Sequence, residues 1–324
     1  MLFRQRTRPV RFGLTRLVPT VILAAAVTAA CAQDVPPPDL DRLDREFLQA
    51  LENKDYTKAL EVVEENYRDL ERYLTQTAYR IACMHCVVGH KDQAYKWLEK
   101  AVDAGYRDAR RLERDDDFES IRKQERFRAL VKRAWATGYI AMLEREQRAE
   151  YQKPDQVMAA LALRPGERVA DIGAGSGYFT IPVAKAVGPA GVVWALDIEQ
   201  PLLDYIEKRL EKEKLQNVRL KLVPNDDPQL PTGGVDTILI VNTWHHIQDR
   251  SEYARKLRAA LAPGGRVVII DYIPKPRDER PWGPRPEHLL AKAALDAEFA
   301  RAGLKPVKQH DFLPEQYFVE YGAE

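Results

Sequence analysis

The stretch Val169–Thr180 reads Val-Ala-Asp-Ile-Gly-Ala-Gly-Ser-Gly-Tyr-Phe-Thr and decides the fold of the second half of the chain. A short apolar strand ends at Asp171, and glycines follow at alternate positions, Gly173, Gly175 and Gly177. Because Gly173 and Gly175 lack side chains, a ligand can lie against the bare backbone of this turn. Amides at the start of the next helix then face any negative group on the ligand. The run predicts a strand, a ligand-binding turn and a helix, in that order.

The spacing of the glycines separates two ligand classes. A dinucleotide-binding turn follows Gly-x-Gly-x-x-Gly, and with Gly173 and Gly175 in place it would need glycine where this chain has Tyr178. The pattern Asp-x-Gly-x-Gly-x-Gly instead resembles the first motif of the class I S-adenosylmethionine-dependent methyltransferases. The resemblance implies that Asp171, Gly173, Gly175 and Gly177 contribute to binding S-adenosylmethionine as the cofactor.

Strands alternate with helices from about Asp155 onward, which is typical of a mostly parallel sheet covered on both faces. We expect a doubly wound, seven-stranded Rossmann-like sheet, with strands at 168–172, 192–197, 218–223, 237–241 and 266–271 and two more near 307–312 and 317–321. Ligands of such sheets bind beyond the carboxyl ends of the strands. The turn Leu261–Arg266, Leu-Ala-Pro-Gly-Gly-Arg, is also characteristic of the family, and the ending Asp311–Phe318 resembles that of exported methyltransferases.

Acidic residues follow the second and third expected strands. Asp197 lies about twenty residues after the glycine turn, where a carboxylate can accept both ribose hydroxyls; dinucleotide enzymes share this feature. By resemblance, Asp226 takes the adenine amino group, although Asn225 stands where the family usually has glycine. Asp227 competes for the same role. Asn242, directly after the fourth strand, completes the predicted cofactor set.

Two histidines follow the fourth strand in the run Val241–Ile247 and are the candidate catalytic residues. Either His245 or His246 can remove a proton from an acceptor near neutral pH. His246 is preferred, because it alternates with Trp244 along an extended strand end. The competing interpretation is that the pair packs against or caps the next helix. His245, His246 and Asp249 could also be read as metal ligands. No metal site is expected there, because no further ligand is evident nearby in the sequence.

The N-terminus predicts export. Five arginines precede the fourteen-residue apolar stretch Leu17–Ala30, which falls short of the roughly 20 residues that span a bilayer. Two processing outcomes stay open: cleavage after Ala32, or a lipobox-like sequence in which Cys31 carries a lipid anchor. Both place the protein outside the cytosol of a bacterium, in the periplasm or on a membrane; the competing interpretation is a cytosolic protein with an apolar tail. Removing the five arginines from the net charge of +1 leaves −4, which gives no general reason to bind nucleic acid.

The first half of the chain has helical periodicity. We expect an export signal at 1–32, a proline-rich linker at 33–39, a helical domain at 40–135 and the methyltransferase-like domain at 136–324. Residues 78–108 resemble a tetratricopeptide repeat, and 47–66 resemble an earlier copy about 34 residues before it. Cys83 and Cys86 are interpreted as packing residues rather than a metal site completed by His85 and His90.

The sequence as a whole predicts an S-adenosylmethionine-dependent methyltransferase that acts on a small-molecule acceptor. No cysteine occurs in the methyltransferase-like domain, which excludes a covalent cysteine mechanism there. The alternative is a catalytically silent methyltransferase fold that serves as a scaffold and uses the repeats to bind a protein partner.

Overall fold

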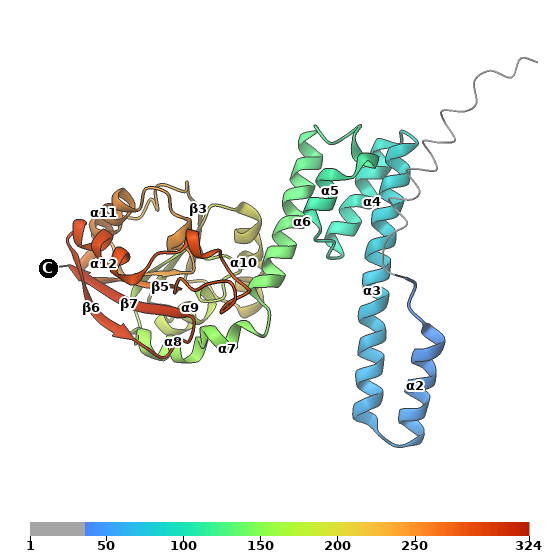
Figure 1. Ribbon diagram of the computed structural model, residues 1–324, viewed down its shortest axis with the longest axis horizontal. Helices are drawn as coiled ribbons and strands as arrows, with labels where there is room; N and C mark the ends of the chain where they lie inside the picture. Colours follow the sequence, from blue (N-terminus) through green and yellow to red (C-terminus); the bar gives the residue numbers. More distant parts are fainter. Residues whose placement is uncertain (1–35, 324) are drawn as a thin grey trace, which may run out of the picture. The chain divides into compact units, whose positions relative to one another are not determined.

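The computed structural model describes residues 36–323 (Figure 1), so the predicted export signal and the lipid anchor at Cys31 lie outside the described residues. Residues 36–38 of the predicted linker have no regular secondary structure. The chain divides into two compact units, the first ending at Thr137 and the second beginning at Gly138. Over the described range, no helix is both long and apolar enough to cross a membrane.

The N-terminal unit is helical throughout its described residues. Its helices are α2 (Leu40–Glu52), α3 (Tyr56–Val87), α4 (Lys91–Asp103), α5 (Ala109–Arg114), the short η1 (Asp116–Phe118) and the first part of α6 (Glu125–Leu143). Helix α3 begins where the Asp55 carboxylate accepts a hydrogen bond from the amide of Lys58, and it ends before Gly89, which has φ +84°.

The predicted division into two repeats differs from this arrangement. The turns expected near residues 53–55 and 89–92 are present, but α3 is one continuous helix of 32 residues. It includes both the second helix of the earlier copy and the first helix of the later copy, because residues 67–77 contain no proline or glycine to end it. The helical character of the segment is confirmed, whereas its kinship with tetratricopeptide repeats stays a prediction.

Cys83 and Cys86 are free and buried in the core of this unit, as expected of packing residues. The sulfur of Cys86 lies 3.3 Å from the hydroxyl of Ser120. Cys83, Asp115 and Asp117 bring ligand-type atoms within 4.8 Å of one another. The Asp115 carboxylate, however, accepts from the hydroxyl of Tyr79 and the amide of Asp117, so protein donors already use it.

The C-terminal unit is built on a seven-stranded sheet. Its strands are β1 (Arg168–Ile172), β2 (Val192–Asp197), β3 (Val218–Leu222), β4 (Val235–Val241), β5 (Leu261–Tyr272), β6 (Leu304–His310) and β7 (Gln316–Ala323). The strand order is β3-β2-β1-β4-β5-β7-β6, and β7 runs antiparallel to both of its neighbours while β1 to β5 are parallel. The predicted mostly parallel, seven-stranded Rossmann-like sheet is confirmed.

Helices cover both faces of this sheet (Figure 1). One face packs against α11 (Arg250–Ala260) and α12 (Lys292–Arg301), and the other against α8 (Pro154–Leu161), α9 (Thr180–Val187) and α10 (Gln200–Glu213). Side chains of β1 alternate between the two faces. Ala170 and Ile172 pack in the core beneath α11 and α12, and Val169 packs in the core beneath α8 and α9. The carboxyl ends of the parallel strands therefore share one rim of the sheet, where the predicted site residues lie.

Candidate active site

The glycine turn after β1 packs tightly against the rest of the rim. Gly173, Gly175 and Gly177 have φ values of +71°, +58° and +77°, a region that favours glycine. A β-carbon on Gly173 would lie 2.3 Å from Oγ1 of Thr243, just after β4, and one on Gly175 would lie 2.9 Å from Cδ1 of Leu143, in α6. The turn thus requires glycine at 173 for both conformation and space, and at 175 mainly for conformation, because the end of the Leu143 side chain can shift.

Two buried acids support this turn. Asp197, at the end of β2, accepts hydrogen bonds from the amides of Gly175 (2.9 Å) and Glu199 (3.0 Å), so it fixes the loop across the rim. Burial raises the pKa of Asp197. The Asp171 carboxylate accepts from the hydroxyl of Thr180 at 2.6 Å. Burial raises the pKa of Asp171 to about 6; Asp197 adds to this effect and the Thr180 hydrogen bond opposes it.

This raised pKa predicts a pH-dependent stability. The folded state holds the Asp171 proton more tightly than the unfolded chain, so the contribution to stability is fully present below about pH 4 and is lost as pH rises through about 6. Asp171→Asn keeps an oxygen for Thr180 and cannot ionise. We expect the variant to gain about 3 kcal/mol of unfolding free energy over the wild type between pH 4 and pH 7, measured by urea denaturation. A stability difference that is constant with pH would contradict the assignment.

The turn fits an adenosyl ligand in its donors and acceptors. The hydroxyl of Ser176, within the turn, is buried and lacks a hydrogen-bond partner among the described residues. Asp197 and Asp226 supply carboxylate oxygens at the ends of β2 and β3, the chemistry that ribose hydroxyls and an adenine amino group require. The residues present are therefore compatible with S-adenosylmethionine.

The structure separates the two competing acids after β3. Asp227 accepts from the amide of Gln229 (2.7 Å) and pairs with Lys256 of α11 (3.3 Å), contacts that lower its pKa. Asp226 is exposed, and no hydrogen bond to its carboxylate occurs among the described residues; only its backbone carbonyl accepts, from Lys256. The carboxylate left available to a ligand is that of Asp226, while Asp227 holds the loop.

Asn242 takes part in a closed ring of three side-chain amides. Gln152 of α7 (Arg148–Gln152) donates to Gln316 of β7 (3.0 Å), Gln316 donates to Asn242, and Asn242 donates back to Gln152 (3.1 Å). Asn242 has φ +54°, and its amide nitrogen donates to the carbonyl of Ile270. The side chain of Asn242 is therefore bonded within the protein, which the sequence did not predict. Its role in binding the cofactor stays a prediction.

His245 forms a histidine–carboxylate pair with Asp271 of β5. Its Nδ1 lies 2.7 Å from Oδ1 of Asp271, and both side chains are buried, at 3% and 2% exposed. Asp271 also accepts from the amides of His245 (3.1 Å) and Tyr272 (2.8 Å). A carboxylate only accepts, so Nδ1 of His245 donates to Asp271 and its Nε2 is directed away from that bond. That Nε2 is buried and lacks a partner among the described residues.

The preference for His246 rested on an extended strand end that the structure does not have. Strand β4 ends at Val241, and Trp244–His246 form the 3-10 turn η2. The turn buries Trp244, directs His245 to Asp271 and leaves His246 exposed. Desolvation and the neighbouring His245 lower the pKa of His246, and Asp271 opposes that effect. His288 also lowers the pKa of His246. The Nε2 of His310 lies 2.7 Å from the carboxylate of Glu320 in β7.

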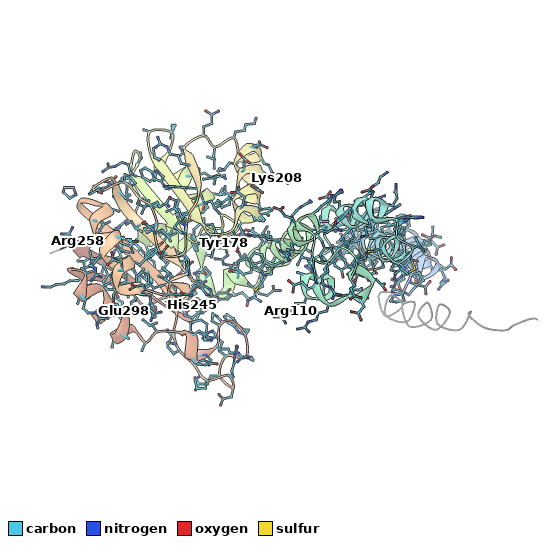
Figure 2. All side chains as sticks on the ribbon, turned by 90° about the horizontal axis from the view of Figure 1, so that it is seen from above. Arg110, Tyr178, Lys208, His245, Arg258 and Glu298 are labelled. Carbon is cyan, nitrogen blue, oxygen red and sulfur yellow. The ribbon has the colours of Figure 1, made fainter. Side chains whose placement is uncertain are left out.

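An aromatic wall stands beside the histidine–carboxylate pair. Tyr151 of α7, Tyr272 at the end of β5 and Trp282 have ring centroids 4.7 to 6.2 Å apart, and Tyr272 lies 6.4 Å from the ring of His245. Arg148 stacks 3.9 Å over Tyr178, which follows the glycine turn; Tyr178 and His245 are both labelled in Figure 2. Tyr151 and Trp282 were not predicted, because no local motif links these distant segments.

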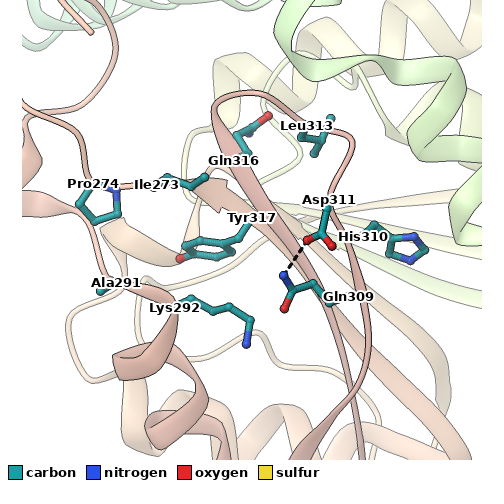
Figure 3. Close-up of a pocket in the computed structure, with 10 residues that line it drawn as sticks. All are labelled: Ile273, Pro274, Ala291, Lys292, Gln309, His310, Asp311, Leu313, Gln316 and Tyr317. Atoms are coloured by element: carbon teal, nitrogen blue, oxygen red, sulfur yellow. Dashed lines mark hydrogen bonds between the residues drawn. The ribbon is translucent and has the colours of Figure 1, made fainter. Parts of the chain in front are cut away.

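A cavity of about 410 Å³ opens next to this wall (Figure 3). Its lining comes from the segment after β5, the start of α12 and the β6–β7 connection: Ile273, Pro274, Ala291, Lys292, Gln309, His310, Asp311, Leu313, Gln316 and Tyr317. None of the predicted cofactor residues lines it. It shares Gln316 with the amide ring, so it lies near β5 and β7 rather than at the glycine turn.

Comparisons with known proteins agree with this geometry. Residues 170–267 match the profile of a family described as "Methyltransferase domain". A crystal structure of a SAM-dependent methyltransferase from Aquifex aeolicus superposes with a TM-score of 0.53 at 25% identity, covering 57% of this chain and 96% of that one. The C-terminal unit has the class I S-adenosylmethionine-dependent methyltransferase fold. The cofactor of this methyltransferase domain is S-adenosylmethionine.

Two curated proteins are similar to parts of this methyltransferase domain. Nocamycin O-methyltransferase from Saccharothrix syringae is 30% identical over 134 residues, covering 41% of this chain and 47% of that protein. A ubiquinone/menaquinone biosynthesis C-methyltransferase from Burkholderia mallei is 30% identical over 115 residues, covering 36% and 47%. The chain thus spans about half the length of these curated relatives.

The N-terminal unit matches a different family profile. Residues 41–137 match a profile described as "A/B hydrolase-like, N-terminal domain".

Proposed function

We propose that the methyltransferase domain methylates a hydroxyl-bearing small molecule and that His245 is the general base. The observation that carries this proposal is the buried pair of His245 and Asp271, whose Nε2 is unpartnered at the carboxyl end of β4. S-adenosylmethionine, when bound, supplies an activated methyl group, and its transfer leaves the electron pair of the broken carbon–sulfur bond on sulfur. His245 accepts the proton that the hydroxyl loses, and Asp271 stabilises the resulting imidazolium.

The position of the pair supports this role. Thr243, two residues before His245, is the residue that would contact a β-carbon on Gly173, so the base follows directly on the segment that packs against the glycine turn. A base is needed only when the accepting atom starts out protonated, which favours a hydroxyl over an unprotonated amine. One of the two curated relatives is an O-methyltransferase and the other a C-methyltransferase, so the choice of a hydroxyl rests on the histidine–carboxylate pair. From the N-terminal sequence alone, we further propose that this activity operates outside the cytosol.

Calorimetric titration of the purified protein tests cofactor binding directly. We expect S-adenosylhomocysteine to bind and NAD not to bind, because Tyr178 replaces the third glycine of the dinucleotide turn. Asp226→Ala should weaken S-adenosylhomocysteine by about tenfold, since a hydrogen bond to a charged group contributes about 1.5 kcal/mol or more. Asp278→Ala, at an exposed acid outside the predicted set, serves as the control.

The titration also has results that would refute the proposal. No heat with S-adenosylhomocysteine would overturn it. Tight binding without transfer to any hydroxyl acceptor in a broad screen would favour the catalytically silent alternative.

A further inference from the structure

Arg280 is a buried arginine whose hydrogen-bonding capacity is only partly used. Its side chain is 1% exposed. One terminal nitrogen, Nη1, donates to the carbonyl of Ile273 at 3.0 Å and lies 3.7 Å from the carboxylate of Glu315. The other two nitrogens, Nε and Nη2, are buried and have no hydrogen-bond partner among the described residues. Leaving charged donors unpaired in the interior is costly, so an occupant of this edge is expected.

The two unpartnered nitrogens are adjacent and form one edge of the guanidinium. This edge is a fork that matches the two oxygens of a carboxylate. The same protein shows the match at Arg168, whose Nε and Nη2 donate to the two oxygens of Asp236 at 3.0 and 2.8 Å. Glu315 does not fill the fork of Arg280, because it approaches Nη1 and also pairs with Lys275 at 3.0 Å.

Arg280 packs against two residues of the aromatic wall. Its guanidinium carbon lies 5.0 Å from the ring centre of Tyr272 and 5.9 Å from that of Trp282. Tyr272 in turn lies 6.4 Å from the ring of His245. The fork of Arg280 and the ring of His245 thus both lie near the ring of Tyr272.

The loop that carries Arg280 is held from its outer side by another arginine. Arg277, which is exposed, donates to the carbonyls of Pro281 and Gly283, both at 3.2 Å. These contacts fold the loop so that Arg280 points inward while Arg277 remains in solvent. Residues 273–285 contain no helix or strand, so these side-chain contacts set the shape of the loop.

We propose that Arg280 binds a carboxylate group of the methyl acceptor, which makes the acceptor a small hydroxy acid that contacts Tyr272. This rests on the proposed function, because His245 must receive the hydroxyl of the same molecule. A carboxylate fits better than a phosphate: it carries a single charge and two oxygens for one fork, and Glu315 nearby disfavours a dianion.

The test uses benzoate as the probe and its neutral isostere benzamide as the matched ligand, titrated calorimetrically into the full protein with and without S-adenosylhomocysteine. We expect benzoate to bind roughly tenfold or more tightly than benzamide and than phenylphosphonate. Arg280→Gln should remove the preference for benzoate. Arg285→Gln, at a side chain 70% exposed in the same loop, should leave it intact.

A second variant separates a binding role from a structural one. Arg280→Met removes the unpaired buried charge, so the ligand-free variant should melt at the same temperature as the wild type or higher, and benzoate should raise the melting temperature of the wild type alone. A clearly lower melting temperature, equal affinity for benzoate and benzamide, or tighter phenylphosphonate binding would overturn the proposal. Benzoate discrimination without S-adenosylhomocysteine binding would refute the proposed function instead, and the reverse pattern would refute only the role of Arg280.

Discussion

Gly173→Ala is expected to weaken S-adenosylhomocysteine binding about 100-fold or more and to lower the unfolding free energy by about 2–4 kcal/mol. The added β-carbon would lie 2.3 Å from Oγ1 and 2.5 Å from Cγ2 of Thr243, and φ +71° is unfavourable for alanine. Relief requires the turn to move away from the segment after β4, and this movement displaces the backbone that the ligand contacts. Calorimetry and urea denaturation measure the two effects.

Gly188→Ala is the matched control for this substitution. Gly188 has φ +65°, close to that of Gly173, but its β-carbon would meet no atom within 4 Å. With ψ −176° it lies in a region used almost only by glycine, so the variant should show a backbone cost of about 1–3 kcal/mol and retain normal ligand affinity. Wild-type affinity in Gly173→Ala would show that the turn does not hold the ligand.

His245→Ala is expected to lower the rate of methyl transfer by about 10²- to 10⁴-fold, the usual contribution of a positioned general base. Affinity for S-adenosylhomocysteine should stay near the wild-type value, because His245 contacts Asp271 rather than the glycine turn. Single-turnover transfer from labelled S-adenosylmethionine to a hydroxyl acceptor measures the rate.

The neighbouring histidine supplies the control for this prediction. His246 is exposed and lacks the bond to Asp271, so His246→Ala should retain most of the activity. Asp271→Asn should reduce the rate while leaving both histidines in place, because an amide does not stabilise the charged imidazole. If His246→Ala proves the more damaging change, the assignment of the base must be reversed.

The parts of the fold that could be predicted are those set by local sequence. The strands β1 and β2 have the bounds expected from the sequence, 168–172 and 192–197, and the glycine turn follows from three glycines at alternate positions. The repeat pattern predicts an interruption within Tyr56–Val87, whereas the absence of proline and glycine at 67–77 allows the continuous helix α3 that the structure has.

The parts of the site that could not be predicted depend on contacts between distant residues. Lys256, thirty residues along the chain, decides between Asp226 and Asp227 by pairing with the latter. Asp271, from the neighbouring strand, decides which of two adjacent histidines is oriented. Nε and Nη2 of Arg280 have no hydrogen-bond partner among the described residues. Sequence alone does not show which charged groups remain unpaired after folding.

The ring of three amides has a consequence for acceptor selection. Gln152 makes two of its three bonds, and Tyr151 directly precedes Gln152 on α7. Any displacement of Tyr151 that carries Gln152 with it must break both bonds together and leave amide groups of Asn242 and Gln316 unsatisfied in the interior. Tyr151 is therefore held in position through its neighbour Gln152, and we expect this side of the site to accept only molecules that fit its fixed shape.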